Sequence, residues 1–227
     1  MNSSGQEILS TSAGELPLDQ YCLRQGGKEW KILHVSGVLS QKQETQFLRE
    51  MREKLPYGIT LWAAAVALAH EIAARENDFR GKRVLELGAG TGLPGIVAAS
   101  LAAKVVQTDR NELAMSLCRR NHKLNKVETI EQRGVDWSDW KDAESYDWII
   151  GSDILYSEEM HPHLRRIFES NLAPKGRILL SDPFRGASIK LLEALEAEGW
   201  SISLSKWTVG EENSPRAVGI FELTRQS

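Results

Sequence analysis

Apolar and polar residues alternate with two different periods along this chain, and the rhythm changes near residue 83. Residues 20–35 alternate around a Gly-Gly turn, the pattern expected of a β-hairpin. Residues 44–51 are typical of a short helix, and the proline and glycine that follow are expected to end it. Residues 61–76 predict a longer helix that is rich in alanine and can approach its neighbours closely.

From residue 83 onward, short apolar runs alternate with segments of helical periodicity. The predicted strands are 83–87, 104–109, 126–137, 146–153, 176–183, 200–210 and 217–226, and the predicted helices are 96–103, 112–124, 159–172 and 189–200. This alternation predicts an α/β fold, a Rossmann-like doubly wound, mostly parallel seven-stranded sheet with right-handed crossovers. No helix separates the last two strands, so we expect a hairpin that gives the sheet an antiparallel edge through the C-terminal strand.

We therefore expect one main domain with an N-terminal elaboration. Residues 1–15 are predicted to be a disordered or frayed tail, residues 16–80 an N-terminal hairpin and helices that pack on the main domain, and residues 81–227 the main domain itself. Neither an internal repeat nor a Pro/Gly/Ser-rich linker interrupts the alternation.

Composition narrows the possible functions. The 227 residues are 41% hydrophobic and 26% charged with a net charge of −3, as in ordinary globular proteins, and give no basic balance for nucleic acid. The most apolar helical stretch ends in charge well short of the ~20 residues that a membrane span needs, and the first dozen residues lack the pattern of a secretory signal. Two distant cysteines, Cys22 and Cys118, predict neither a disulfide framework nor a metal site, which favours a reducing, cytoplasmic location.

A glycine-rich turn follows the first strand of the main domain. Residues 90–95 fit the dinucleotide fingerprint G-x-G-x-x-G, and Asp109 follows about 20 residues on, at the end of the next strand. The register argues against a dinucleotide: because the strand ends at Leu87, the turn is better described as E-x-G-x-G over residues 86–90. A carboxylate there would repel a pyrophosphate and attract a cofactor with cationic sulfonium and ammonium groups, namely S-adenosylmethionine.

The ends of the next strands offer further cofactor contacts. Asp109 can accept hydrogen bonds from both ribose hydroxyls, Asp136 from the adenine amino group, and Trp137 can cover the adenine ring. The alternatives are a helix cap for Asp109 and simple core packing for Trp137. Ligands bind at the carboxyl ends of strands in open α/β sheets, so the coincidence of these side chains at one edge favours a cofactor site.

Together these residues resemble a known family. The stretches are 57–69 (YGITLWAAAVALA), 84–95 (VLELGAGTGLPG), 108–109 (TD), 135–137 (VDW) and 152–156 (SDILY). They are similar to the class I, seven-β-strand methyltransferases and, more narrowly, to the methyltransferase-like family 16, which contains many protein-lysine methyltransferases. The resemblance covers about residues 55–224.

The resemblance implies that Trp62 packs over the methionine end of the cofactor, although Ala63 stands where members often have proline. An aromatic anchor on a core-facing helix is the alternative for Trp62. The full set of candidate cofactor-binding residues is Trp62, Glu86, Gly88, Ala89, Gly90, Gly92, Leu93, Asp109, Arg110, Asp136, Trp137 and Ser152.

Asp153 and Tyr156 are the candidate catalytic residues. Many methyltransferases that act on nucleobases or glutamine have Asn/Asp-Pro-Pro-aromatic here, but this chain has Asp-Ile-Leu-Tyr. Without the prolines, a carboxylate suits a cationic acceptor such as lysine. We expect Asp153 to orient the amine and to accept a proton through water, rather than to act as a direct general base. Tyr156 can offer its ring or its hydroxyl, and Ile154 and Leu155 are expected to turn inward. The alternative for Asp153 or Ser157 is a cap on the helix predicted after them.

Three other features carry less weight. His161 and His163 lack a further ligand at usable spacing, so no metal site is predicted. Arg185, after the fifth strand of the main sheet, could contact an acidic substrate surface or form a surface ion pair. Residues 118–123 (CRRNHK) are expected to be a solvated helix face.

The main hypothesis is a cytoplasmic, monomeric, S-adenosylmethionine-dependent methyltransferase that acts on a lysine side chain of a protein, with no nucleic-acid, membrane or metal partner. One alternative is the same chemistry on a small-molecule amine. The other is a nucleotide-dependent oxidoreductase or a catalytically silent cofactor-binding module.

Overall fold

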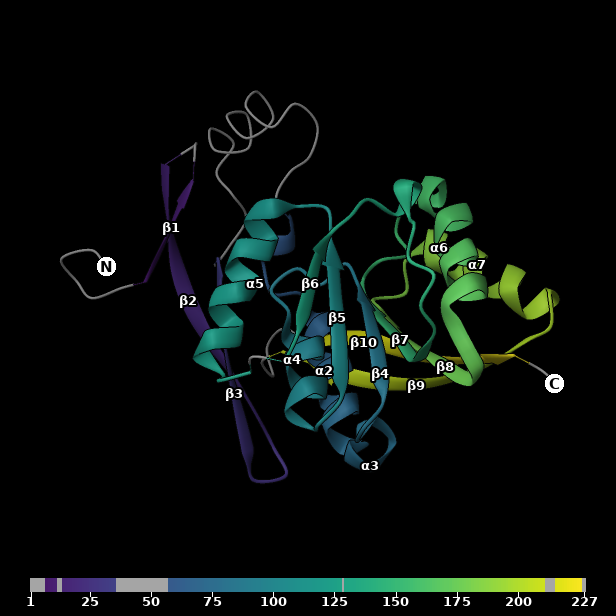
Figure 1. Ribbon diagram of the computed structural model, residues 1–227, viewed down its shortest axis with the longest axis horizontal. Coiled ribbons are helices and arrows are strands. Elements are labelled where there is room, and N and C mark those ends of the chain that lie inside the picture. Colours follow the sequence, from purple (N-terminus) through teal and green to yellow (C-terminus); the bar gives the residue numbers. More distant parts are fainter. Residues whose placement is uncertain (1–6, 12–13, 36–56, 128, 211–214, 226–227) are drawn as a thin grey trace.

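A computed structural model describes residues 7–11, 14–35, 57–127, 129–210 and 215–225 and contains two β-sheets (Figure 1). The helix predicted over residues 44–51 lies outside the described residues. The larger sheet has the order β6-β5-β4-β7-β8-β10-β9. Its strands are β4 (Arg83–Leu87), β5 (Lys104–Asp109), β6 (Glu131–Gly134), β7 (Tyr146–Ser152), β8 (Leu172–Asp182), β9 (Trp200–Val209) and β10 (Arg216–Arg225). The predicted seven-stranded, mostly parallel α/β sheet is confirmed.

The predicted hairpin of β9 and β10 is confirmed, and it gives this edge of the sheet antiparallel pairing. Within the hairpin, β10 inserts between β8 and β9 and is antiparallel to both. The side chains explain this order. β10 buries Val218 and Ile220 on one face and Phe221 and Leu223 on the other, whereas the middle of β9 is exposed. A strand that is apolar on both faces belongs in the interior of a sheet.

Helices cover both faces of this sheet (Figure 1). One face carries α2 (Ala63–Ala74), α3 (Glu76–Phe79), α4 (Leu93–Ser100) and α5 (Glu112–Leu124), and the other carries α6 (His161–Asn171) and α7 (Gly186–Ala197). Single 3-10 turns lie at η1 (Tyr57–Ile59), η2 (Trp137–Asp139) and η3 (Glu158–Met160). Among the described helices, none combines the length and the apolar character that crossing a membrane requires.

The N-terminal sheet contains one strand more than expected. β2 (Gly14–Gln25) and β3 (Lys28–Val35) form the predicted hairpin, but β1 (Ile8–Thr11) also pairs with β2. The prediction of a frayed tail over residues 1–15 is therefore wrong for this strand. Leu9 is buried in a cluster with Leu16 and Leu117 of α5, and this burial supplies the stabilisation that a four-residue strand lacks by itself.

Two asparagines, one within α5 and one at its C-cap, join the N-terminal sheet to the main domain. Asn121 accepts a hydrogen bond from the Leu33 backbone N–H (2.8 Å) and donates to the Leu33 carbonyl (3.0 Å). Asn125 makes the same pair of bonds with Lys31. The edge of β3 is thus paired with side chains of a helix. Residues 118–123 are only in part a solvated face, because Cys118, Asn121 and His122 are buried.

Candidate functional site

Five strand ends bring most of the predicted site residues into one row. The strands β6, β5, β4, β7 and β8 are neighbours, and their registers align Gly134 with Asp109, Thr108 with Leu87, and Ser152 with Ser181. The chain runs from β4 outward to β5 and β6 and then returns to β7 on the other side. Ligands bind in open α/β sheets at such a reversal, outside the carboxyl ends of the strands.

The turn between β4 and α4 has the predicted register, because its first glycine is Gly88. Gly88, Gly90 and Gly92 have φ angles of 67°, 54° and 86°, in the left-handed region that favours glycine. Ala89 donates to the Thr108 carbonyl (2.9 Å), and Gly92 stands at the N-cap of α4, directly before Leu93. The loop therefore presents bare backbone at the end of β4, where a ligand can approach closely.

Glu86 lies below this loop and does not face the open edge. Its side chain is 1% exposed and accepts hydrogen bonds from the Gln107 amide and from the Gly95 backbone N–H. A Cβ at position 95 would overlap the Glu86 carboxylate. The expected direct attraction between Glu86 and a cationic cofactor is therefore replaced by a structural role, in which Glu86 fixes α4 against β4 and β5.

Gln107, which the sequence analysis missed, organises a buried polar cluster under the loop. Its amide donates to the Gly92 carbonyl (3.0 Å), and its oxygen accepts from the His122 Nε2 (2.6 Å) and the Cys118 thiol (3.3 Å). Burial raises the pKa of the Cys118 thiol and lowers the pKa of His122 to about 4. A glutamine directly after Val105 and Val106, inside a predicted strand, was the available signal.

Burial raises the pKa of Glu86 to about 8, and this predicts a pH dependence. A carboxyl group whose folded pKa exceeds the unfolded value contributes stability fully below pH 4.5, and that contribution is lost as the pH rises through 8. The Glu86→Gln substitution keeps a hydrogen-bond acceptor at this position, and the new side chain is neutral at every pH. Its free energy of unfolding relative to wild type should therefore rise between pH 5 and pH 9, by on the order of a few kcal/mol, in urea titrations.

The matched control for this prediction is Glu193→Gln, at an exposed position of α7. It should show the pH dependence of the wild type. His122 is present in all three proteins, so its titration cancels in the comparison. Parallel curves for Glu86→Gln and wild type would contradict the assignment of a neutral Glu86.

Asp109 fastens the glycine loop to the end of β5. Its carboxylate accepts hydrogen bonds from the backbone N–H groups of Gly90 (3.0 Å) and Asn111 (2.9 Å), and burial raises its pKa. Asn111, not Asp109, caps α5, because its side chain accepts from the Ala114 N–H (3.0 Å). The helix-cap alternative for Asp109 is therefore wrong.

Arg110, Asp136 and Trp137 connect the ends of β5 and β6. The Arg110 guanidinium lies 3.6 Å from the Asp136 carboxylate, which also accepts from the backbone N–H of Ser138 (3.0 Å) and caps η2. The Trp137 ring lies within 3.5 Å of the position that a Cβ of Gly88 would take. Trp137 is partly buried and thus reaches from the end of β6 to the start of the glycine loop.

The segment before α2 lies over the same edge. Trp62 is the N-cap residue of α2, and its indole donates to the Tyr57 carbonyl (3.0 Å). Gly58 packs so tightly against Gly90 that the missing Gly90 Cβ would lie 3.1 Å from the Gly58 oxygen. Tyr57 and Gly58 are therefore parts of the site that the sequence analysis missed. The buried Ser181 hydroxyl donates to the Ala64 carbonyl (2.8 Å) and fixes α2 to the end of β8.

The loop after β7 has the packing predicted for it. Ile154 and Leu155 are buried, whereas Tyr156 is 56% exposed. Asp153 has a left-handed backbone (φ 51°), and its N–H donates to the Ser181 carbonyl (2.8 Å). Neither Asp153 nor the Ser157 hydroxyl caps η3, whose N-cap makes no side-chain hydrogen bond.

His161 has a structural partner at the start of α6. Its Nε2 lies 2.9 Å from the Leu155 carbonyl, to which it donates. Within the described residues, no group of three or more His, Cys, Asp or Glu side chains is arranged to hold a metal ion. His161 therefore supports the loop that carries Asp153.

Asp153 is already paired with a cation of the protein itself. Both of its oxygens accept from the Arg185 guanidinium, at 2.6 Å from Nε and 2.7 Å from NH2. The Asp153 side chain is 9% exposed, and that of Arg185 is 43% exposed. The ion-pair alternative for Arg185 is thus confirmed, and its partner is the residue expected to hold the substrate. The same pairing raises the pKa of Arg185.

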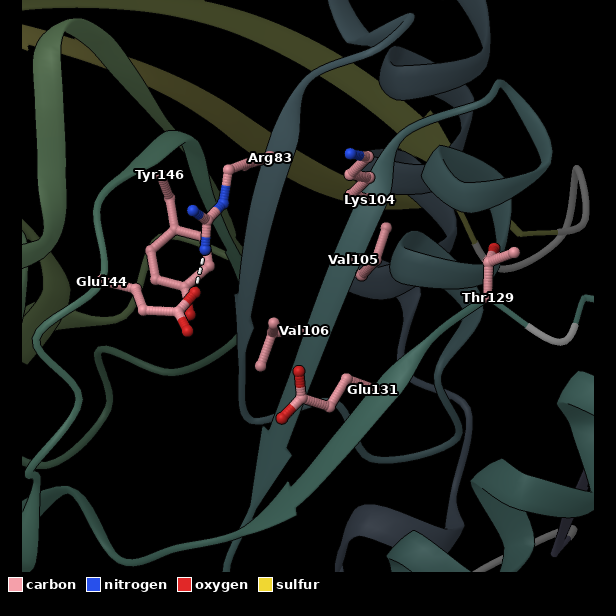
Figure 2. A pocket seen from close by; sticks show the side chains of 8 residues that line it. All are labelled: Arg83, Lys104, Val105, Val106, Thr129, Glu131, Glu144 and Tyr146. Carbon is pink, nitrogen blue, oxygen red and sulfur yellow. Dashed lines mark hydrogen bonds and ion pairs between the residues drawn. The ribbon is translucent and has the colours of Figure 1, made fainter.

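A cavity of about 320 Å³ lies elsewhere, toward the start of the strands (Figure 2). It is lined by Arg83, Lys104, Val105, Val106, Thr129, Glu131, Glu144 and Tyr146. Figure 2 shows the Arg83 guanidinium paired with the Glu144 carboxylate beside the Tyr146 ring. Because these residues include none of the predicted site residues, the cavity is separate from the row of strand ends.

Comparison with protein families gives a match over residues 40–191 to a family model described as "Lysine methyltransferase". Among curated proteins, the chain is 36% identical over 138 residues to the protein N-lysine methyltransferase METTL21A of Xenopus tropicalis, covering 59% of this chain and 64% of that protein. It is also 36% identical over 139 residues to the histone-arginine methyltransferase METTL23 of Xenopus laevis, covering 59% and 58%. The chain thus spans less than two thirds of the length of these relatives.

The fold is also found in solved structures. The 16S rRNA N2 G1207 methyltransferase of T. thermophilus, solved with AdoMet and guanosine, aligns with a TM-score of 0.61 and 17% identity. The alignment covers 92% of this chain and 51% of that protein. At this identity the likeness concerns the fold, which is that of a Rossmann-like methyltransferase.

Proposed function

Because the chain belongs to the lysine methyltransferase family, we propose that it transfers a methyl group from S-adenosylmethionine to a lysine side chain of a protein. One observation carries this proposal. The glycine loop that Asp109 fastens follows β4, and the carboxylate of Asp153 directly follows the neighbouring β7. A cofactor bound over the loop would lie beside an acidic group suited to an amine.

The residues of this edge fit the proposed cofactor. The Asp109 carboxylate accepts from the backbone N–H groups of Gly90 and Asn111, and a carboxylate has lone pairs enough to accept from ribose hydroxyls as well. Trp137, beside Gly88, offers an apolar surface for adenine, and Trp62, the N-cap residue of α2, would pack over the methionine part. When bound, S-adenosylmethionine supplies the sulfonium methyl group.

The chain's own residues would contribute positioning more than covalent chemistry. A lysine amine with an unperturbed pKa of about 10.4 must lose a proton before it can attack a methyl group in line. Asp153 orients the amine, and the exposed Tyr156 offers its ring face to the cationic side chain. The proton leaves to solvent, which reaches this edge at the exposed Tyr156.

Arginine is a second candidate acceptor, and two observations support it. One relative is named a histone-arginine methyltransferase, and Asp153 binds a guanidinium in the bidentate geometry that suits arginine. The family description and the METTL21A relative favour lysine. A small-molecule amine and an oxidoreductase have no comparable support.

The remaining features of the proposal concern partners and location. The net charge of −3 supports a protein acceptor over nucleic acid. We keep the prediction that the protein acts as a monomer. Cys22 and Cys118 are free, which supports a cytoplasmic location.

Two measurements test the proposed function. Titration calorimetry should detect binding of S-adenosylhomocysteine and no heat with NAD(P). Incubation of a cell lysate with methyl-labelled cofactor should label a protein band that survives nuclease and is removed by protease, and acid hydrolysis should release methyl-lysine. Binding of NAD(P) alone, or label confined to nucleic acid or small metabolites, would refute the proposal. Methyl-arginine would select the second acceptor.

A further inference from the structure

We propose that Arg185 is a positioning residue for methyl transfer, which offsets the charge of Asp153 so that the carboxylate orients the acceptor amine without holding it as an ammonium ion. The inference rests on the proposed lysine methylation and adds a residue and a mechanism to it. It follows from an arrangement that the sequence analysis did not predict, the side-by-side pairing of Asp153 with Arg185 at the row of strand ends.

The pairing is built into the fold on the Asp153 side. The backbone of Asp153 donates to the Ser181 carbonyl (2.8 Å), which fixes the loop after β7 to the end of β8. The buried neighbours Ile154 and Leu155 prevent the loop from turning outward. Because the Asp153 side chain is only 9% exposed, its carboxylate has little freedom to choose another partner.

Arg185 is fixed just as firmly at its backbone. The buried Asp182 accepts from the Arg185 N–H (2.7 Å) with one oxygen and from the Ser188 hydroxyl (2.5 Å) with the other. Phe184 has a left-handed backbone (φ 63°), which is rare for a bulky residue and marks a constrained turn. Its ring packs edge-on against Phe221 at 6.1 Å, so the core maintains the conformation that directs Arg185 toward Asp153.

The charged and titratable groups around the pair leave Arg185 as the balancing cation. Asp182 is buried at the end of β8 with both oxygens occupied, and burial raises its pKa. Tyr156 lies near Arg185 on the exposed side. From η3, Glu158 pairs with Lys190 of α7 at 2.6 Å, and from α6, His161 donates to the Leu155 carbonyl.

The pairing with Arg185 changes how Asp153 affects the protonation of the acceptor lysine. An unbalanced carboxylate beside lysine stabilises the ammonium form and so opposes the loss of a proton that the reaction requires. The Arg185 clamp offsets that charge, while each carboxylate oxygen can still accept a second hydrogen bond from an amine. The site can therefore direct the neutral amine toward the methyl group. The proton goes to solvent, the amine nitrogen forms the new N–C bond, and the S–C bond of the sulfonium breaks.

The test compares the full-length wild type with Arg185→Leu and Arg185→Lys, using as acceptor the lysate protein that the wild type labels. In Arg185→Leu the unbalanced Asp153 carboxylate should raise the pKa of the bound lysine, since a nearby opposite charge shifts a pKa by about one unit or more. The acidic limb of the kcat–pH profile should therefore move up by about one pH unit, and kcat at neutral pH should fall about tenfold. KM should not rise, because the bare carboxylate binds ammonium well. Arg185→Lys keeps the charge, so its acidic limb should stay at the wild-type position.

Arg80→Leu is the matched control, because it removes an exposed arginine that pairs with Glu76 within α3 and its flank. It should leave the profile unchanged. If Arg185→Leu does not fold, Arg185→Gln provides the same neutral substitution. The inference about Arg185 would be overturned, and the proposed function would stand, if the acidic limb of an active Arg185→Leu or Arg185→Gln enzyme did not move. The same conclusion would follow if Arg185→Lys showed the shift seen in the neutral variants. A wild type that labels no protein lysine would overturn the proposed function, and this inference with it.

Discussion

Asp153→Asn is expected to lower kcat/KM by about 10²-fold or more while the affinity for S-adenosylhomocysteine stays within about twofold of wild type. The substitution keeps the shape of the side chain but removes the carboxylate that would orient the acceptor amine. It also leaves the Arg185 guanidinium without its partner, and this cation then repels a lysine ammonium. The loss should therefore exceed that of one hydrogen bond. Labelled methyl transfer and titration calorimetry measure the two quantities separately.

The matched control for this substitution is Asp139→Asn in η2, where the carboxylate is exposed and pairs with Lys141 at 2.9 Å. It removes the same charge from a surface ion pair, and such pairs contribute little to stability. We expect full activity. Undiminished activity in Asp153→Asn would reduce Asp153 to a structural residue. A loss of cofactor affinity equal to the loss of activity would instead mean that the loop after β7 had moved.

Much of the fold could be predicted because the central strands β4, β5 and β7 are buried on both faces and the helices α5 and α6 are amphipathic. The predicted bounds 104–109 and 112–124 agree with β5 and α5 as observed. The strand predicted over 126–137 is only β6 (Glu131–Gly134), an edge strand that pairs with β5 alone. β1 has only four residues and depends on Leu9 packing against the distant α5, and a strand this short leaves no clear periodicity in the sequence.

The candidate site, like the fold, could be predicted only in part from the sequence. The glycine loop, Asp109 and Asp153 could be predicted because each stands at a strand end whose place in the sheet follows from the alternation of elements. Arg185 lies 32 residues from Asp153, and its pairing depends on the left-handed backbone of Phe184. The inward position of Glu86 depends on Gly95, which lets α4 approach the sheet closely. Sequence spacing contains neither kind of information.

Gly92→Ala is expected to destabilise the protein by about 2–5 kcal/mol and to weaken cofactor binding together with stability. Residue 92 has a φ of 86°, and a Cβ there would overlap the Cys118 sulfur. Cys118 is fully buried and contacts Gln107 and His122, so it cannot retreat without disrupting the polar cluster under the loop. Urea denaturation gives the stability, and titration with S-adenosylhomocysteine gives the affinity.

The chain offers both a control and a rescue for this prediction. Gly134→Ala, at the end of β6, adds a Cβ with no atom within 4 Å and with an ordinary φ, so its stability should change by less than about 0.5 kcal/mol. Cys118→Ala combined with Gly92→Ala removes the overlap but not the left-handed strain, and should recover only part of the loss. Equal effects of Gly92→Ala and Gly134→Ala would show that the loop adapts to a side chain. No recovery in the double variant would show that backbone strain alone, and not the contact with Cys118, reserves this position for glycine.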